Sequence, residues 1–353
     1  MTDRPLAADI HGNEGPPDDE VSETVGATMQ MQDAHQDAHQ DAPDVVDLGA
    51  IAADELTDHE RIAPGLAAQA SRMLPDAAIP GALHVVSTPI GHLGDISIRA
   101  LAVLHQASVI ACEDTRHTRT LLSRYGIRTA TIAVHEHNEA QASPAIIRRL
   151  QVGEAVALVS DAGTPLLSDP GARLVQSVVN AGLRVVPVPG ASAPLAALVA
   201  SGISPYPHTF VGFLARKGEE RKSGLAACAR SPHTTVLFEA PLRLVDTLRD
   251  LAQAAGAERM AAVAREITKR FEEIKRGTLA ELTAYYQDTP PRGEIVIVLA
   301  GAALEAPTEQ ALETRAAALR AEGKSPRDIV SELVSLHGAT RNLAYKLAHS
   351  RDS

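Results

Sequence analysis

Three turns rich in glycine and proline, each placed directly after an apolar run, constrain the fold of this chain more than any other feature. They lie at residues 88–95, 160–171 and 187–193. Apolar runs of this length are typical of buried strands, and helical patterns follow each turn. Turns in such positions lie at the carboxyl ends of strands, where open α/β sheets bind their ligands. The sequence therefore predicts one pocket lined mainly by backbone.

From Leu83 onward, strand-like and helix-like segments alternate, which predicts a largely parallel sheet built from βαβ units. The strands expected in this half are residues 83–87, 109–112, 131–134, 156–159 and 184–188. The helices expected with them are residues 97–106, 115–124, 143–151, 171–181 and 192–200.

A second half begins near Ser201 and has less regular spacing, which favours a mixed sheet. Its expected strands are residues 208–213, 234–239, 260–265 and 294–300. Its expected helices are residues 219–229, 241–254 and 279–287. Beyond Pro307 the chain becomes helical and polar, and Ser325 and Thr340 are expected to cap helices there.

Charge separates the first 80 residues from the rest of the chain. They hold 17 acidic and three basic residues, a net charge of -14, whereas 27 acidic and 30 basic residues lie beyond them and the whole chain carries -11. A segment of this composition buries too little apolar surface to offset its ordering entropy. We therefore expect residues 1–80 to form a disordered acidic tail, with a short helix near residues 47–73 as an option.

The expected organisation has four parts, and several kinds of site are excluded from it. The parts are the tail at 1–80, an N-terminal α/β domain at 81–193, a C-terminal α/β domain at 194–305 and a small helical domain at 306–353. The two cysteines, Cys112 and Cys228, show no CxxC spacing, which disfavours disulfides and a zinc site. No apolar run reaches the roughly 20 residues that span a bilayer. We expect a cytoplasmic protein that binds no metal and no membrane.

Five motifs follow one another in a distinctive order. They are residues 85–95 (VVSTPIGHLGD), 113–118 (EDTRHT), 160–171 (SDAGTPLLSDPG), 238–243 (FEAPLR) and 265–269 (REITK). Together they closely resemble the RsmI family of the tetrapyrrole methylase superfamily, over about residues 81–350. Two positions depart from the pattern. His92 stands where many members have Asn, and Thr164 stands where the superfamily typically has Asp.

The resemblance implies an α/β, tetrapyrrole-methylase-like fold with S-adenosylmethionine bound in a cleft between two α/β domains. It implies methylation of the ribose 2'-hydroxyl of a cytidine in the decoding region of 16S rRNA, as free RNA or in the small ribosomal subunit, by a homodimer. Taken with the three turns, it implies the cofactor-binding residues Pro89, Gly91, Asp161, Gly163, Thr164, Pro189, Ser192 and Ala193.

A ribose hydroxyl is a weak nucleophile, so a carboxylate that removes its proton would assist the reaction. Glu113, Glu239 and Glu266 each follow an expected strand and are candidates for this role, with a capping or salt-bridge role as the alternative. Basic side chains beside the pocket are expected to contact RNA phosphates. They are Arg116, His117, Arg119, Lys217, Arg221 and Lys269.

Two other functions stay open at this point. One is a methylase of the same fold that acts on a tetrapyrrole or a diphthamide precursor, although a small macrocycle does not require two basic patches. The other is a ribosome assembly factor that binds RNA without catalysis, although the intact glycine and proline turns argue against it.

Overall fold

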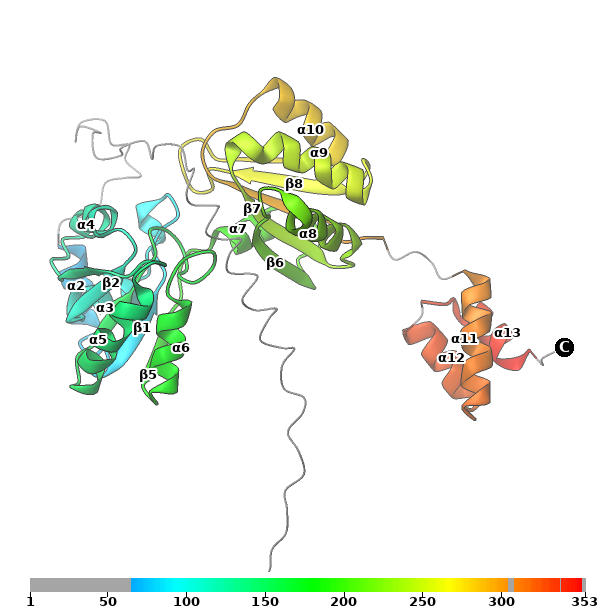
Figure 1. Ribbon diagram of the computed structural model, residues 1–353, viewed down its shortest axis with the longest axis horizontal. Helices are drawn as coiled ribbons and strands as arrows, with labels where there is room; N and C mark the ends of the chain where they lie inside the picture. Colours follow the sequence, from blue (N-terminus) through cyan, green and yellow to red (C-terminus); the bar gives the residue numbers. More distant parts are fainter. Residues whose placement is uncertain (1–64, 304–307, 337, 351–353) are drawn as a thin grey trace, which may run out of the picture.

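The computed structural model describes residues 65–303, 308–336 and 338–350 of the protein. This part of the chain contains two five-stranded sheets with flanking helices, followed by a bundle of helices near its end (Figure 1). The expected α/β fold with two sheets and a small helical unit is therefore confirmed.

The first sheet is entirely parallel, with strand order β3-β2-β4-β1-β5. Its strands are β1 (Ala82–Val86), β2 (Val109–Cys112), β3 (Thr131–Ala133), β4 (Val156–Leu158) and β5 (Arg184–Val188). All five lie where the apolar runs predict them, because helices cover both faces and each central strand is a nearly continuous apolar run. Val85 pairs with Leu158 on one side and with Pro187 on the other, so the carboxyl ends of β4, β1 and β5 are level.

Two of the four helices that follow the strands in this half, α3 (Ile98–Gln106) and α4 (Thr115–Arg124), begin at residues whose side chains cap them. The other two are α5 (Glu139–Gln151) and α6 (Ala172–Asn180). Asp114 caps α4 by accepting hydrogen bonds from the N–H groups of Arg116 and His117. The N-cap of α6 is Gly171, which has no side chain, and the buried carboxylate of Glu139 accepts the N–H of Leu174 at 2.7 Å instead.

Residues 65–80 belong to the folded body, which corrects the boundary expected at residue 80. Helix α2 (Leu66–Met73) packs against α3 and buries Ala67 and Ala70 in the core shared with α3 and β2. The Gln106 side chain accepts the N–H of Ala78 and donates to the carbonyl of Leu74, which holds the segment after α2 in place. The rest of the expected tail, residues 1–64, lies outside the described residues.

The second sheet is mixed, as expected, with strand order β6-β7-β10-β8-β9. Only β6 and β7 run parallel, and the other neighbours are antiparallel. The strands are β6 (His208–Phe213), β7 (Thr234–Glu239), β8 (Met260–Arg265), β9 (Glu273–Thr278) and β10 (Ile295–Leu299). The sequence did not predict β9, because this edge strand carries Glu273, Lys275 and Arg276 and shows no apolar run.

Helices α7 (Ala193–Ala200), α8 (Gly218–Arg230), α9 (Leu244–Ala255) and α10 (Leu279–Asp288) accompany this sheet, and a short 3₁₀ helix, η5 (Pro241–Arg243), precedes α9. Ala197 and Leu198 of α7 pack against Val236, Ala262 and Val298 of the second sheet. The turn before α7 follows β5 of the first sheet. The third glycine and proline turn therefore connects the two halves.

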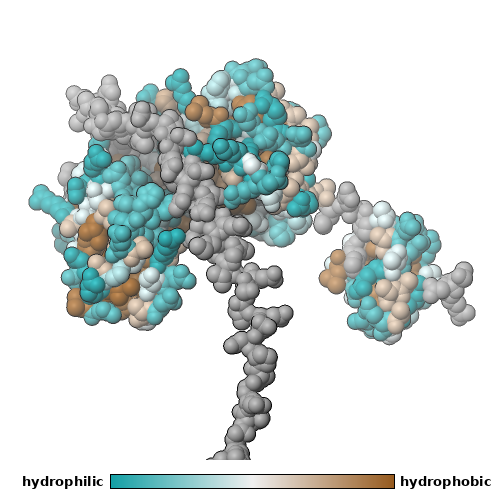
Figure 2. Space-filling view, in the orientation of Figure 1, coloured by the Kyte–Doolittle hydropathy of each residue, from teal (hydrophilic) through white to brown (hydrophobic). Residues whose placement is uncertain are grey.

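The last described unit is a bundle of α11 (Glu309–Ala321), α12 (Pro326–Ser335) and α13 (Arg341–His349) around its own core. Both expected caps are present: Ser325 accepts from Asp328 N–H, and Thr340 accepts from Leu343 N–H. No helix in the described ranges is long and apolar enough to cross a membrane. Figure 2 accordingly shows a face that is mostly hydrophilic, with small separate hydrophobic areas.

Candidate active site

The three glycine and proline turns come together at the carboxyl edge of the first sheet. Thr88 and Gly163 form a short antiparallel bridge, with N–H to carbonyl distances of 2.8 and 3.1 Å. The N–H of Ser87 donates to the carbonyl of Val188 at 3.1 Å, which extends β5 beside the first turn. The expected meeting of these turns is therefore present.

Thr164 joins all three turns through one hydroxyl group. Its Oγ1 lies 3.0 Å from the Oγ of Ser87, directly before the first turn, and donates to the Ala191 carbonyl at 2.9 Å in the third. Thr164 is the position where the superfamily pattern typically has Asp. A hydroxyl can donate to a carbonyl, which a carboxylate cannot do, so Thr suits this bridging position.

The first turn also touches the second half of the chain. Thr268, in the REITK motif, accepts the N–H of His92 through its Oγ1 at 3.0 Å. A Cβ on Gly91 would lie 2.5 Å from Lys269 Cγ and 3.1 Å from the Ile267 carbonyl oxygen, so only glycine permits this approach. Glu266 and Thr268 have φ of 51° and 65°, a left-handed backbone that is uncommon for such residues. Two motifs about 175 residues apart thus form one structure.

His92 has a local role that explains its side chain. Its Nδ1 accepts the N–H of Gly94 at 3.0 Å and caps the short 3₁₀ helix η4 (Leu93–Asp95). The carbonyl oxygen of Asn, the residue that many RsmI proteins have here, is also an acceptor and favours the same cap position.

Two hydroxyl groups at the meeting point of the turns have no hydrogen-bond partner among the residues that the structure describes. They are Thr88 Oγ1 and Ser192 Oγ, both buried. Buried polar atoms are almost always hydrogen-bonded, so an orphaned pair beside three backbone turns marks the place where a polar ligand completes the bonding. S-adenosylmethionine, with its ribose hydroxyls, adenine nitrogens and amino acid end, is a ligand of this chemistry.

Four carboxyl groups follow β2 and β4 beside these turns: Glu113, Asp114, Asp161 and Asp169. Hydrogen bonding from the Arg116 N–H lowers the pKa of Asp114, whose own N–H lies 3.4 Å from Asp161 Oδ1. Burial raises the pKa of Asp161. Burial, and then the charge of Glu113, raise the pKa of Asp169 to about 7.

Asp169 is held by an unusual turn. The preceding residues Leu166 and Ser168 have φ of 75° and 72°, although neither is glycine. Backbone strain of this kind costs free energy and collects at functional sites. Asp169 lies inside the 160–171 motif, yet it was not among the predicted site residues, because its burial and its acidic neighbour come from the fold.

Glu239 and Glu266, two of the three predicted bases, are held by protein partners. Glu239 is 2% exposed, accepts from Thr247 Oγ1 and the Ala240 N–H, and pairs with Arg243 at 3.1 Å. Glu266 accepts from Lys269 Nζ at 2.9 Å and from the N–H of Glu294 at 3.0 Å. These contacts match the salt-bridge role that was the alternative, and a catalytic role for either carboxylate stays a prediction. Glu113 remains beside Asp169.

The predicted RNA-contacting residues divide into exposed and paired groups. Arg116, His117 and Arg119 are exposed on α4, and Lys217 is exposed before α8. Arg221 pairs with Asp250 at 2.6 Å and donates to Thr247, and Lys269 pairs with Glu266 and Glu294. The described residues contain no group of three or more His, Cys, Asp or Glu side chains that could hold a metal ion.

Comparison with known proteins identifies the family. Residues 82–283 match the model of the Tetrapyrrole (Corrin/Porphyrin) Methylases. The chain is 46% identical to "Ribosomal RNA small subunit methyltransferase I" of Mesorhizobium japonicum, over 77% of this chain and 93% of that protein. It is 45% identical to the protein of the same name from Xylella fastidiosa, over 75% of this chain and 98% of that protein.

A third protein of that name, from Streptococcus pyogenes, is 36% identical over 80% of this chain and 99% of its own length. Among solved structures, a cobalt precorrin-4 methyltransferase is 19% identical with a TM-score of 0.49, over 62% of this chain and 95% of that chain. The sequence matches alone carry the assignment, and they place this chain in the tetrapyrrole methylase family, among the proteins named ribosomal RNA small subunit methyltransferase I.

Proposed function

We propose that this protein uses S-adenosylmethionine to methylate the ribose 2'-hydroxyl of a cytidine in the decoding region of 16S rRNA. The observation that carries the proposal is the joining of three strand-end turns through Thr164, with two orphaned hydroxyls beside them, in a chain 46% identical to a small-subunit rRNA methyltransferase. The RsmI-like motifs favour the ribose oxygen of cytidine as the acceptor within that rRNA.

The cofactor supplies a methyl group bound to a positively charged sulfur, and the three turns would hold it. Thr88 and Ser192 would donate or accept through their orphaned hydroxyls. Gly163 leaves room at the centre of the turns, since a Cβ there would lie 3.1 Å from Ile90 Cγ2 and 3.8 Å from the Ala191 carbonyl oxygen. Pro89, Asp161, Pro189 and Ala193 lie in the same turns and complete the predicted lining.

The chemical step needs an acceptor for one proton. The ribose 2'-oxygen forms a bond to the methyl carbon while the carbon–sulfur bond breaks, and its proton passes to a protein carboxylate. Asp169 is the acceptor in this proposal, because its raised pKa lets it take and release a proton near neutral pH, and Glu113 beside it raises that pKa further. Glu239 and Glu266 keep the structural roles that their contacts give them.

RNA would approach along α4. Arg116 and His117 lie in the first turn of this helix, directly after Glu113 and Asp114. Their exposed side chains can contact phosphates beside the reacting ribose. Lys217 extends the basic surface from the second half of the chain.

Transfer of labelled methyl groups to defined substrates tests the proposal. The purified protein is incubated with labelled S-adenosylmethionine and, separately, with small ribosomal subunits lacking the modification, free 16S rRNA, and a precorrin. Label in 2'-O-methylcytidine from rRNA supports the proposal, and the Asp169→Asn variant serves as the control for adventitious transfer. Label only in the precorrin assigns the protein to the alternative of the same fold. Binding of rRNA with no transfer assigns it to the assembly factors.

The assembly and location that the resemblance implies belong to the same proposal. A homodimer would lengthen the basic surface available to a folded RNA, and cytoplasmic assembly of the small subunit would supply the substrate. Light scattering at micromolar concentration checks the first point, since a mass near 37.2 kDa would show a single chain.

A further inference from the structure

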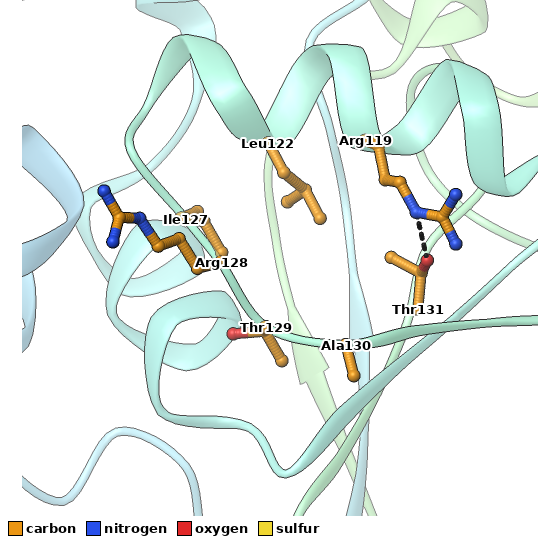
Figure 3. A pocket seen from close by; sticks show the side chains of 7 residues that line it. All are labelled: Arg119, Leu122, Ile127, Arg128, Thr129, Ala130 and Thr131. Atoms are coloured by element: carbon orange, nitrogen blue, oxygen red, sulfur yellow. Dashed lines mark hydrogen bonds between the residues drawn. The ribbon is translucent and has the colours of Figure 1, made fainter.

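A pocket separate from the three turns lies at the outer edge of the first sheet. It has a volume of about 350 Å³ and is formed by α4, the loop after it and the start of β3 (Figure 3). This volume is within the range of small-molecule sites, roughly 300–1,000 Å³. The strand β3 is the edge of its sheet, so the pocket faces outward.

Two arginines define the ends of the pocket. Figure 3 shows Arg119 at one end and Arg128 at the other, with Leu122 and Ile127 between them. Leu122 and Ile127 are 3% and 5% exposed and give the pocket an apolar floor. Thr129 and Thr131 also line the pocket, and the Thr129 hydroxyl donates to the Leu104 carbonyl at 2.7 Å. An apolar floor between two cationic side chains suits a ligand that carries an anionic group on a flat ring or a sugar.

The Arg119 guanidinium is fixed in place while its outer donors remain available. Its Nε donates to Thr131 Oγ1 at 3.1 Å, as the dashed line in Figure 3 marks. No carboxylate among the described residues forms an ion pair with Arg119 or Arg128. A guanidinium held in this way loses little entropy on binding and offers a fork that matches phosphate oxygens.

The charge around the pocket has one sign. Residues 115–131 contain four arginines and one histidine and no acidic residue. Arg116 and Arg119 are three residues apart on α4 and therefore share a face of the helix. A basic path thus runs from the first turn of α4, beside the candidate active site, to the pocket at the other end.

We propose that this pocket binds a phosphodiester and its attached nucleoside of the rRNA strand, outside the nucleotide that is methylated. The inference rests on the proposed function and adds to it a second anchoring site, with Arg128, Thr129 and Thr131 as members that the sequence did not single out. Arg119 and Arg128, at opposite ends of the pocket, contact the phosphates on either side of the nucleoside, and Leu122 and Ile127 contact its sugar or base. A second anchor outside the active site fixes the direction in which the RNA strand crosses the active site.

Fluorescence anisotropy with labelled 16S rRNA fragments tests the site. The variants are Arg119→Ala, Arg128→Ala and their double variant, and the control is Arg148→Ala, which removes an exposed arginine from α5. We expect the double variant to bind RNA about tenfold more weakly or worse, and each single variant to lower the slope of log affinity against log salt by about 0.7. Affinity for S-adenosylmethionine should match that of the unaltered protein, which shows that the variants fold.

A lysine variant and binding to the assembled subunit separate the possible explanations of weakened RNA binding. Arg119→Lys keeps the charge and loses the fork, so it should bind between the unaltered protein and Arg119→Ala. If the double variant binds RNA as tightly as Arg148→Ala, the pocket is not an RNA site. Weakened binding to the assembled subunit with unchanged binding to free RNA would also overturn it, in favour of a ribosomal protein. Absence of rRNA methylation by the unaltered protein would instead contradict the proposed function.

Discussion

Asp169 is the residue whose protonation the proposed chemistry depends on. With a pKa of about 7, its carboxyl is mostly protonated at pH 6 and mostly ionised at pH 8. Turnover of the unaltered protein should therefore rise across this interval with a midpoint near pH 7. Asp169→Asn should lower turnover by about 10²-fold or more and keep the affinities for cofactor and RNA. Single-turnover rates across the pH range measure both effects.

Glu113 provides the matched control for that profile. Removing its charge in Glu113→Gln takes away one of the causes that raise the pKa of Asp169, so the midpoint should move to lower pH. Burial of Asp169 persists in this variant, so the midpoint should stay above the usual range of Asp, near 3.9. An unmoved midpoint, or full turnover in Asp169→Asn, would rule out this carboxyl as the proton acceptor.

Protonation of Asp169 also changes the stability of the folded protein with pH. Its pKa is raised in the folded protein, so the folded state binds the proton more tightly than the unfolded state does. The stabilisation of the folded state that comes from this proton is fully present below about pH 3.9. It is lost as the pH rises to about 7. Asp169→Asn should therefore raise the melting temperature at pH 8 more than at pH 5. Calorimetry at the two pH values checks this and shows that the variant folds.

The sequence predicted which turns come together but not how the charged residues beside them are paired. The turns are local, because glycine and proline set the backbone where each strand ends. The partners of Glu239 and Glu266 include Thr247 and the N–H of Glu294, which no spacing in the sequence connects with them. The raised pKa of Asp169 likewise depends on Glu113, 56 residues away in a neighbouring strand end.

At the scale of elements, the contact between the first turn and the REITK loop depends on Gly91. An alanine Cβ there would meet Thr268 Oγ1 at 2.7 Å and the Ile267 carbonyl at 3.1 Å, so the loop or the turn must move. Gly91→Ala should lower the melting temperature by several degrees and weaken cofactor binding. In Gly224→Ala the new Cβ meets only the Leu214 side-chain end at 3.0 Å, so this variant should stay close to the unaltered protein. Equal melting temperatures for the two would contradict a tight contact at Gly91.

The start of α6 is stabilised from another helix. Glu139→Ala would leave the Leu174 N–H buried without an acceptor, at a cost of about 1–3 kcal/mol. Glu139→Gln keeps a side-chain oxygen and should lose less. Urea unfolding of the two variants measures the difference, and similar losses in both would mean that the carboxylate charge, rather than the hydrogen bond, is what matters.

Elements with regular apolar runs were predictable, and those shaped by tertiary contacts were not. The predicted strand 109–112 matches β2, and 115–124 matches α4. Helix α5 begins four residues before the expected start at 143, and Pro144 lies inside it. Edge strand β9 pairs on one side only, so its charged side chains reach solvent and give no strand signal.

For the whole molecule, the order of elements in the sequence already indicated two α/β halves. Regular βαβ units precede the third turn, and less regularly spaced strands follow it. The sequence could not show that α7 packs on the second sheet while following the last strand of the first. It also could not show that the first turn and the REITK motif lie in contact. Both contacts place the three turns where the two halves meet.

Mass spectrometry of 16S rRNA shows whether this protein methylates a decoding-region cytidine in the cell. The rRNA is taken from a strain lacking this gene and from the same strain carrying either the unaltered gene or the Asp169→Asn variant. We expect one decoding-region cytidine to lose its ribose methyl group in the deletion strain, to regain it with the unaltered gene and not to regain it with the variant. A cytidine that keeps its ribose methyl in the deletion strain would contradict the account.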